Sequence, residues 1–442
     1  MNKKVALALV LLIMTFGVVA AATTTTITIY SQGIACIEDS TTLSLSQGIN
    51  TVRIPVPDGF VPESLKVESR GEVISQSFHP GGADSILSAA RGKPIEVESE
   101  DGTIYRGVLI STSGGIALQD NAGTIHLIEN PTRVSIAGKE LELSPYLELT
   151  LSAATAGKYQ VALTYLSTGF NWGMGYVGTL SGDGKEMGLT GWVQLSNSTE
   201  FAISGANVRL VAGQVNQVEK GYAEARVAPM AVPLAQEAAF EYHLYTLPGQ
   251  IDLPAGKTIL VPYGNYSGIP VEKVYTFEGS AVDVSIKFVN DDAHRLGVPL
   301  PAGDVRLFQA RPDGTIFIGA DSIPHTPVGE DVSITPGNAF DITGTRVRTE
   351  SAKLSKSTYR DTYTITLRNH KEEAVTVNVL EHPSGNTWKI ISAGISYKED
   401  ATFTFVTVVL PYEKIDSHTV KFVAHVPANG ESKVIYTVEY SY

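Results

Sequence analysis

Carboxylate, amide and imidazole side chains are concentrated in one short segment, Asn290-Asp-Asp-Ala-His294. Side chains of these types bind hard cations or zinc. Further residues of the same types follow it, namely Asp321, His325, Glu330 and Asp331. If the two loops meet at one end of a β-sandwich, Asp291, Asp292 and His294 become candidate metal ligands. The alternative is a polar turn, because Asn and Asp are common turn residues and the spacing matches no defined ligand pattern.

A second candidate site is the aromatic, glycine-rich segment Phe170-Asn-Trp-Gly-Met-Gly-Tyr176. Rings such as those of Trp172 and Tyr176 stack on sugars, so both residues are candidate ligand-binding residues. Large aromatic side chains also fill the cores of β-sheets, which is the alternative for the same two rings.

Familiar catalytic signatures are missing from the sequence. It contains no Gly-x-Ser-x-Gly, no Ser-x-x-Lys and no His-Glu-x-x-His, which are marks of serine and zinc hydrolases. The run Asn369-His-Lys-Glu-Glu373 places a histidine beside carboxylates, as acid–base catalysis would need, and it equally suits a hairpin loop. No catalytic residue and no cofactor is therefore assigned, and whether the chain is an enzyme stays open, with a non-catalytic role favoured.

Charge and cysteine content exclude several classes of function. The 442 residues include 33 Lys and Arg against 46 Asp and Glu, a formal net charge of −13. A surface of this sign repels phosphate backbones, so we expect no nucleic-acid partner. Cys36 is the only cysteine, which excludes an internal disulfide and a cysteine-based zinc site.

The N-terminal segment predicts export. Lys3 and Lys4 precede an apolar run over 5–20, and Ala20-Ala-Ala22 follows, which are the three regions of a secretory signal peptide. We expect cleavage before Thr23 and a secreted or cell-envelope location. The alternative is an uncleaved anchor, because 5–22 approaches the roughly 20 residues that span a bilayer. Contact with a membrane is expected only through this segment.

Alternation of apolar and polar residues predicts β-strands along nearly the whole chain. One phrase, an apolar run, a glycine-centred turn and a second apolar run, recurs four times, around Gly48, Gly256, Gly303 and Gly430. Glycine supplies the positive φ of a tight turn, so the phrase predicts strand reversals. We predict an all-β fold of several antiparallel, immunoglobulin-like β-sandwich units, with a small inserted barrel of the SH3 or Sm type.

The predicted organisation has five parts. They are a signal peptide at 1–22, N-terminal strands at 23–91, a small β-barrel at 92–138, a central β-sandwich region at 139–350 and a C-terminal β-sandwich at 351–442. The barrel is predicted from five short strands joined by tight turns, at 94–98, 104–111, 116–119, 124–128 and 133–136. Closing such a sheet would remove its exposed edges.

Several phrases from about 157 onward resemble an exported family known as domain of unknown function 4139. They include Leu296-Gly-Val-Pro-Leu-Pro-Ala-Gly-Asp-Val-Arg306, Leu367-Arg-Asn-His-Lys371 and Gly191-Trp-Val-Gln-Leu-Ser-Asn-Ser-Thr199. The resemblance implies an exported, β-rich protein and supplies no catalytic residue to transfer.

These observations favour an exported, non-catalytic protein that acts as a binding or structural module at the cell envelope or outside the cell. Envelope proteins or glycans are its candidate partners, and free strand edges would allow it to join a larger assembly. The alternative is a secreted hydrolase of glycans or other envelope polymers, with a site built from scattered carboxylates and histidines. Sandwich folds host both activities.

Overall fold

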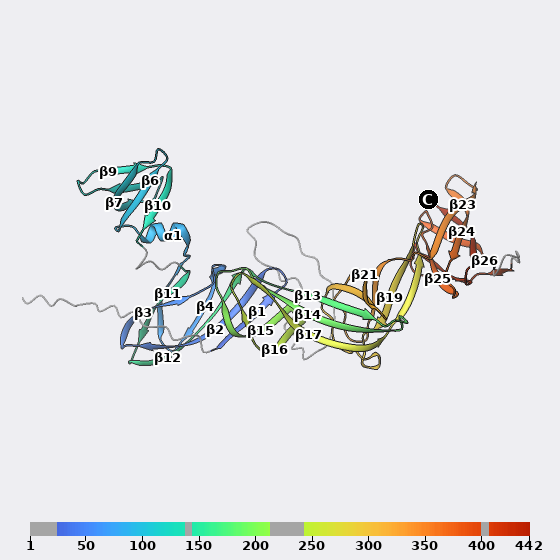
Figure 1. Ribbon diagram of the computed structural model, residues 1–442, viewed down its shortest axis with the longest axis horizontal. Helices are drawn as coiled ribbons and strands as arrows, with labels where there is room; N and C mark the ends of the chain where they lie inside the picture. The colour runs from blue at the N-terminus through green and yellow to red at the C-terminus, as the bar shows by residue number, and fades with distance from the viewer. Residues whose placement is uncertain (1–23, 138–143, 213–242, 399–405) are drawn as a thin grey trace, which may run out of the picture. The chain divides into compact units, whose positions relative to one another are not determined.

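The computed structural model describes residues 24–137, 144–212, 243–398 and 406–442 (Figure 1). The predicted signal peptide lies outside the described residues. Nearly all regular structure in them is β-strand, in several separate sheets, which confirms the all-β prediction. The helices there are α1, Gly82–Ala89, and the 3-10 turn η1, Asp292–His294. No helix of the described residues is long and apolar enough to cross a membrane.

The described residues form two compact units, the first from 24–137, 144–172, 194–212 and 243–260 and the second from 173–193, 261–398 and 406–442. The first unit contains a six-stranded sheet of order β16-β15-β1-β2-β12-β4 and a three-stranded sheet of order β3-β11-β5. The strands of the larger sheet are β1 Thr24–Tyr30, β2 Ile34–Leu45, β4 Phe60–Ser69, β12 Gly157–Thr168, β15 Ile203–Ala212 and β16 His243–Leu253. The smaller sheet has β3 Gly48–Pro55, β5 Glu72–His79 and β11 Tyr146–Ala153.

An insert between β5 and β11 carries a sheet of its own. Its order is β10-β6-β7-β8-β9, and its strands are β6 Pro94–Ser99, β7 Ile104–Ser111, β8 Ile116–Gln119, β9 Ile125–Ile128 and β10 Pro131–Ile136. The five predicted strands are therefore present, and they enclose a core that includes Val97, Leu109 and Leu118. In the described part of the chain no pairing of β9 with β10 closes this sheet into a barrel.

The second unit is built on three sheets, and 170–172, 194–197 and 257–260 of the first of these belong to the first unit. The first has the order β17-β14-β13-β20-β21, with β13 Phe170–Leu180, β14 Glu186–Asn197, β17 Lys257–Pro270, β20 Gly303–Arg311 and β21 Gly314–Ile323. The second is β22-β19-β18-β25-β29-β28, with β18 Glu272–Phe277, β19 Val282–Val289, β22 Asp331–Asn338, β25 Val375–Glu381, β28 Tyr412–Lys414 and β29 Val420–Val426. The third is β23-β24-β30-β26-β27, with β23 Ile342–Lys353, β24 Thr358–Asn369, β26 Thr387–Lys398, β27 Val406–Val409 and β30 Glu431–Ser441.

The last two sheets pack on each other and form the C-terminal sandwich. Their shared core includes Phe277 of β18, Ile365 of β24, Val377 of β25 and Phe422 of β29. The alternation that predicted these strands arises because every second side chain enters this core. Strand β18 pairs in parallel with β25, so the sheet includes strands from both sides of the boundary predicted at 350.

The glycine-centred phrase marks crossings between sheets. Gly48, with φ 99°, begins β3 three residues after β2 ends, and Gly256, with φ 64°, lies between β16 and β17. The strands of each pair belong to different sheets. The third copy differs, because Gly303 has no positive φ and pairs in parallel with Met174 of β13. A Cβ at Gly303 would stand 2.3 Å from the Met174 carbonyl oxygen, so this glycine permits close strand approach rather than a reversal.

Three strands are followed by a buried asparagine that ties them to a neighbouring proline-containing turn. Asn197 ends β14, Asn290 follows β19 and Asn369 ends β24, and each is at most 2% exposed. The Asn197 Nδ2 donates to the Leu253 carbonyl at 3.0 Å. The Asn290 Nδ2 donates to the carbonyls of Thr326 and Pro327 at 3.3 and 2.9 Å, and the Asn369 Nδ2 to those of Val426 and Pro427 at 3.4 and 2.9 Å. The same local construction is therefore used three times along the chain.

Replacing Asn369 with alanine is expected to lower the free energy of unfolding of the C-terminal sandwich by about 2–3 kcal/mol, because buried carbonyls lose their donor. The lost bonds include those to the carbonyls of Glu373, at 2.8 Å, and Pro427, at 2.9 Å. Urea unfolding, with hydrogen exchange of the β24 amides as its readout, measures the loss of stability. Asn386→Ala, at an exposed position of the same sandwich, is the control, and equal midpoints for the two variants would contradict the expectation.

Candidate functional site

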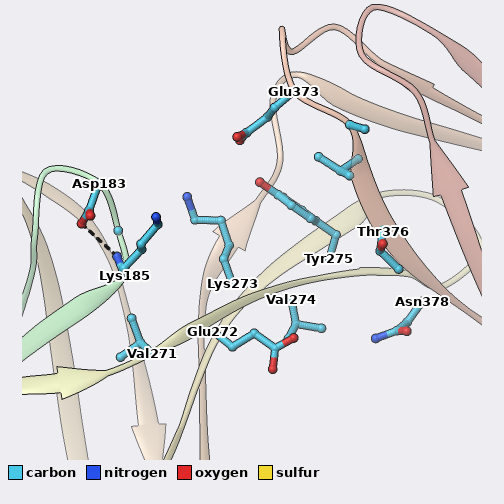
Figure 2. A pocket seen from close by; sticks show the side chains of 13 residues that line it. Asp183, Lys185, Val271, Glu272, Lys273, Val274, Tyr275, Glu373, Thr376 and Asn378 are labelled. Atoms are coloured by element: carbon cyan, nitrogen blue, oxygen red, sulfur yellow. Dashed lines mark hydrogen bonds between the residues drawn. The ribbon is translucent and has the colours of Figure 1, made fainter. Parts of the chain in front are cut away.

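A polar hollow of about 500 Å³ lies beside β18 in the second unit (Figure 2). It is lined by the turn between β13 and β14, by β18 with the residue before it, and by β25 with the two residues that precede it. We call it the Lys273 hollow; the side chains that matter for its chemistry are Lys185, Lys273, Tyr275, Glu373, Thr376 and Asn378.

A tight turn with the sequence Ser-Gly-Asp-Gly-Lys places Lys185 at the hollow. Gly184 takes φ 70°, and the Asp183 carboxylate accepts hydrogen bonds from Ser181 Oγ at 2.6 Å and from the Lys185 N–H at 3.2 Å. These bonds, that of Ser181 first, lower the pKa of Asp183. The Asp183 carboxylate is thus occupied in holding the turn.

Lys273 reaches across to the same turn. The Lys185 carbonyl accepts a hydrogen bond from the Val271 N–H at 2.9 Å, which fixes the start of β18 beside the turn. A Cβ built on Gly184 would lie 3.6 Å from Lys273 Nζ. In the described part of the chain, neither the Lys185 nor the Lys273 amine has a carboxylate within the 4.0 Å of an ion pair.

Tyr275 forms the inner wall of the hollow. Its ring is buried in the sandwich core, while its hydroxyl accepts a hydrogen bond from Lys371 Nζ at 2.9 Å. Lys371 is itself positioned by Asn369, whose Oδ1 accepts from the Lys371 N–H at 3.0 Å. A smaller hollow of about 250 Å³ shares Lys273 and Tyr275 and adds Lys371, Asp341 and the exposed ring of Phe340.

The charged groups of the Lys273 hollow face one another. Figure 2 shows the Lys185 and Lys273 amines pointing into the space that the Glu373 carboxylate and the Tyr275 hydroxyl also face. Glu272 points away from this group, as expected for a neighbour of Lys273 on a strand. The arrangement suits binding of a charged, polar ligand.

The candidate metal ligands lie together in a turn. Asp291 caps η1 and its Oδ1 accepts from the His294 N–H at 2.8 Å and contacts His294 Nδ1 at 2.6 Å. These bonds, that of the His294 ring first, lower the pKa of Asp291. Asp292 lies in the same turn, against Gly297. Among the described residues, no group of three or more His, Cys, Asp or Glu side chains is arranged to hold a metal ion.

Trp172 and Tyr176 are both buried in β13, at 7% and 1% exposure. Trp172 Nε1 donates to the Val211 carbonyl at 3.1 Å, and the Tyr176 hydroxyl donates to the Pro301 carbonyl at 2.8 Å. Their polar atoms are thus paired with backbone, and stacking on a sugar would require these rings to be uncovered.

Two further histidines each contact one carboxylate, in separate parts of the chain. His126 lies 3.0 Å from Asp120, and His382 lies 2.7 Å from Glu278. His370, the histidine of the 369–373 run, uses its backbone N–H to hold the Asp341 carbonyl at 2.8 Å. The side chains of that run that line the two hollows are Lys371 and Glu373.

Lys185, Lys273 and Tyr275 were missed by the sequence reasoning. Only the polar run 369–373 was singled out, as a possible acid–base site or hairpin loop. A signal existed for Lys185, because Ser-Gly-Asp-Gly-Lys is a recognisable turn between two alternating strands. No local signal marks Lys273, since an exposed lysine on a strand is common.

Comparison with protein-family models and with curated proteins finds no match to this chain. The resemblance to the exported family therefore stays a prediction.

Proposed function

We propose that this chain is an exported, non-catalytic binding or structural module that works at the cell envelope or outside the cell. The N-terminal sequence supports export, because a charged start, an apolar run and small residues follow one another there. Packed β-sheets supply a rigid scaffold that stands without disulfides.

The observation that carries the binding role is the Lys273 hollow. Two amines without a carboxylate partner in the described residues and a tyrosine hydroxyl face one open space of about 500 Å³. Their positions are set by the scaffold, through the Asp183 turn and the Lys371–Tyr275 bond. Groups held in place in this way lose little conformational entropy when a ligand binds. Envelope polymers or proteins that carry charged groups are the expected ligands.

Binding to isolated cell envelopes tests the binding role. The purified full chain should co-sediment with envelopes of its source organism, and the Lys185→Gln, Lys273→Gln double variant should be retained about tenfold less, because two charge-assisted contacts are lost. Lys287→Gln is the control, since Lys287 is exposed on the neighbouring strand β19 and does not line the hollow. Equal retention of both variants would remove the hollow from the function.

Export and catalysis are tested in parallel. The full chain should leave the cytoplasm, and a chain lacking 1–22 should remain there. Envelope material incubated with the protein should release no soluble sugars or peptides; release that scales with protein concentration would instead support the hydrolase alternative.

A further inference from the structure

The Lys273 hollow is lined by charged side chains of both signs, the amines of Lys185 and Lys273 and the carboxylates of Asp183, Glu272 and Glu373. The formal net charge of the chain is −13, yet Lys185, Lys273 and Lys371 line the two hollows that meet at Tyr275. Some other lysines of the second unit form ion pairs, for example Lys421 with Glu413 at 2.5 Å. Of the three amines that line the hollows, that of Lys371 donates to the Tyr275 hydroxyl, whereas those of Lys185 and Lys273 form no ion pair among the described residues.

Three hydrogen-bond donors around the Lys273 hollow have no acceptor among the described residues. Two are the amines of Lys185 and Lys273, and the third is the Tyr275 hydroxyl. The Tyr275 oxygen accepts from Lys371 at 2.9 Å, which leaves its own O–H free to donate. Donors that converge in this way, with positive charge on two of them, match a ligand that has several acceptor oxygens and negative charge.

We propose that the Lys273 hollow binds a phosphate group through Lys185, Lys273 and the Tyr275 hydroxyl. This rests on the proposed function, whose ligand it specifies. Lysine amines bind phosphate as point charges. A hollow of about 500 Å³ has the size of sites for small molecules, and it holds a phosphate together with the molecule that carries it. Free phosphate and a phosphate ester of an envelope polymer share this chemistry.

Glu373 provides a second test, in which a substitution should raise the phosphate affinity instead of lowering it. Its carboxylate faces the same space as the two amines, and at neutral pH it repels a phosphate dianion. Glu373→Gln removes that charge while keeping the size of the side chain, so phosphate affinity should rise. Loss of Lys273 and loss of the Glu373 charge therefore shift the affinity in opposite directions, which a general effect on folding would not do.

Equilibrium dialysis of the full chain with labelled inorganic phosphate tests the proposal. We expect saturable binding that Lys273→Gln weakens about tenfold and Glu373→Gln strengthens about threefold, with Lys287→Gln unchanged. Glycerol phosphate is the second probe, and tighter binding of it than of inorganic phosphate identifies a phosphate ester as the ligand class. No saturable binding of either probe, or equal binding by Lys273→Gln and the wild type, overturns the proposal.

The two proposals fail in different ways. If phosphate binds as expected and envelope retention does not depend on Lys185 and Lys273, the phosphate site stands and the proposed function is wrong. If retention depends on both lysines and neither phosphate probe binds, the proposed function stands and the ligand has another chemistry. Melting curves of every variant confirm that the fold is retained.

Discussion

Replacing Arg346 with alanine is expected to lower the free energy of unfolding of the C-terminal sandwich by about 3–5 kcal/mol, because a buried carboxylate loses its cation. Glu381 is 2% exposed, and Arg346 Nε contacts its two oxygens at 3.0 and 2.9 Å. The Tyr436 hydroxyl donates to the same carboxylate. Burial, and then the charge of Glu381, raise the pKa of Tyr436 far above its ordinary value, so the phenol stays protonated and keeps donating.

Arg346 also packs on an aromatic ring, its guanidinium carbon lying 3.9 Å from the centroid of Tyr363. Cation–π contact and ion pairing are both lost in the alanine variant. Urea unfolding, read through hydrogen exchange of β24 and β30 amides, measures the loss of stability.

A matched control is available in the same sandwich. Arg368 contacts Glu431 at 2.8 Å with 48% and 28% of the two side chains exposed. Arg368→Ala should therefore cost less than about 1 kcal/mol, as exposed ion pairs do. A double variant, Arg346→Met with Glu381→Leu, should recover most of the lost stability, because it leaves no unpaired buried charge. Equal losses for Arg346→Ala and Arg368→Ala would contradict this account of the pair.

Replacing Asp361 with asparagine is expected to destabilise the same sandwich by about 2–3 kcal/mol at neutral pH. Asp361 is 0% exposed, and its Oδ2 accepts from Tyr440 at 3.0 Å, from Tyr363 at 3.3 Å and from Arg348 at 3.4 Å. An amide oxygen lacks the negative charge that strengthens these bonds, so each of them becomes weaker in the asparagine variant.

The same carboxylate makes stability depend on pH. Burial acts to raise the pKa of Asp361, and the hydrogen bonds from Ser351, Tyr440 and Arg348 outweigh it, so the pKa lies below the ordinary value of 3.8. A lowered pKa in the folded state means that the contribution is fully present above the unfolded pKa. It is lost as the pH falls through the folded value.

Unfolding measured between pH 6 and pH 2, about the range over which carboxylates titrate, should show a steeper loss of stability below about pH 4 in the wild type than in Asp361→Asn. Asp101→Asn is the control, because its carboxylate also has a lowered pKa but lies at the surface of the insert. Parallel curves for wild type and Asp361→Asn would show that Asp361 is not the source of the acid dependence.

Local patterns predicted the strands well where alternation is regular. The strands β7 and β8 of the insert have the predicted bounds, because a tight turn at Gly102 precedes β7 and another at Gly114 separates β7 from β8, both glycines having positive φ. The alternation of Val375, Val377 and Val379 likewise corresponds to buried positions of β25. Strand formation and the buried face are properties of neighbouring residues, so a sequence read along its length reveals them.

Pairing between distant strands was not predictable in the same way. The parallel pair of β18 with β25 joins residues on either side of the boundary predicted at 350. The three buried asparagines were also missed as a set, because Asn197 and Asn369 each resemble the ordinary polar end of a strand. Their role depends on which turn stands opposite, and this is decided by packing.

The candidate site residues also differ in how far apart they lie in the sequence. Asp291 and His294 are near neighbours in the sequence, and the structure places them 2.6 Å apart in one turn. Lys185, Lys273 and Glu373 come from three distant segments, and only the folded chain brings them to one hollow.

By itself, the sequence determined an all-β protein, its strands and their buried faces, its acidic surface and its lack of disulfides, because these depend on composition and on residues close together in the chain. The tertiary structure alone decided which strands share a sheet, which polar residues are buried, and where amines without partners gather. These features depend on contacts between distant segments, whose pairing is set by the free energy of the whole fold and not by any short stretch of residues.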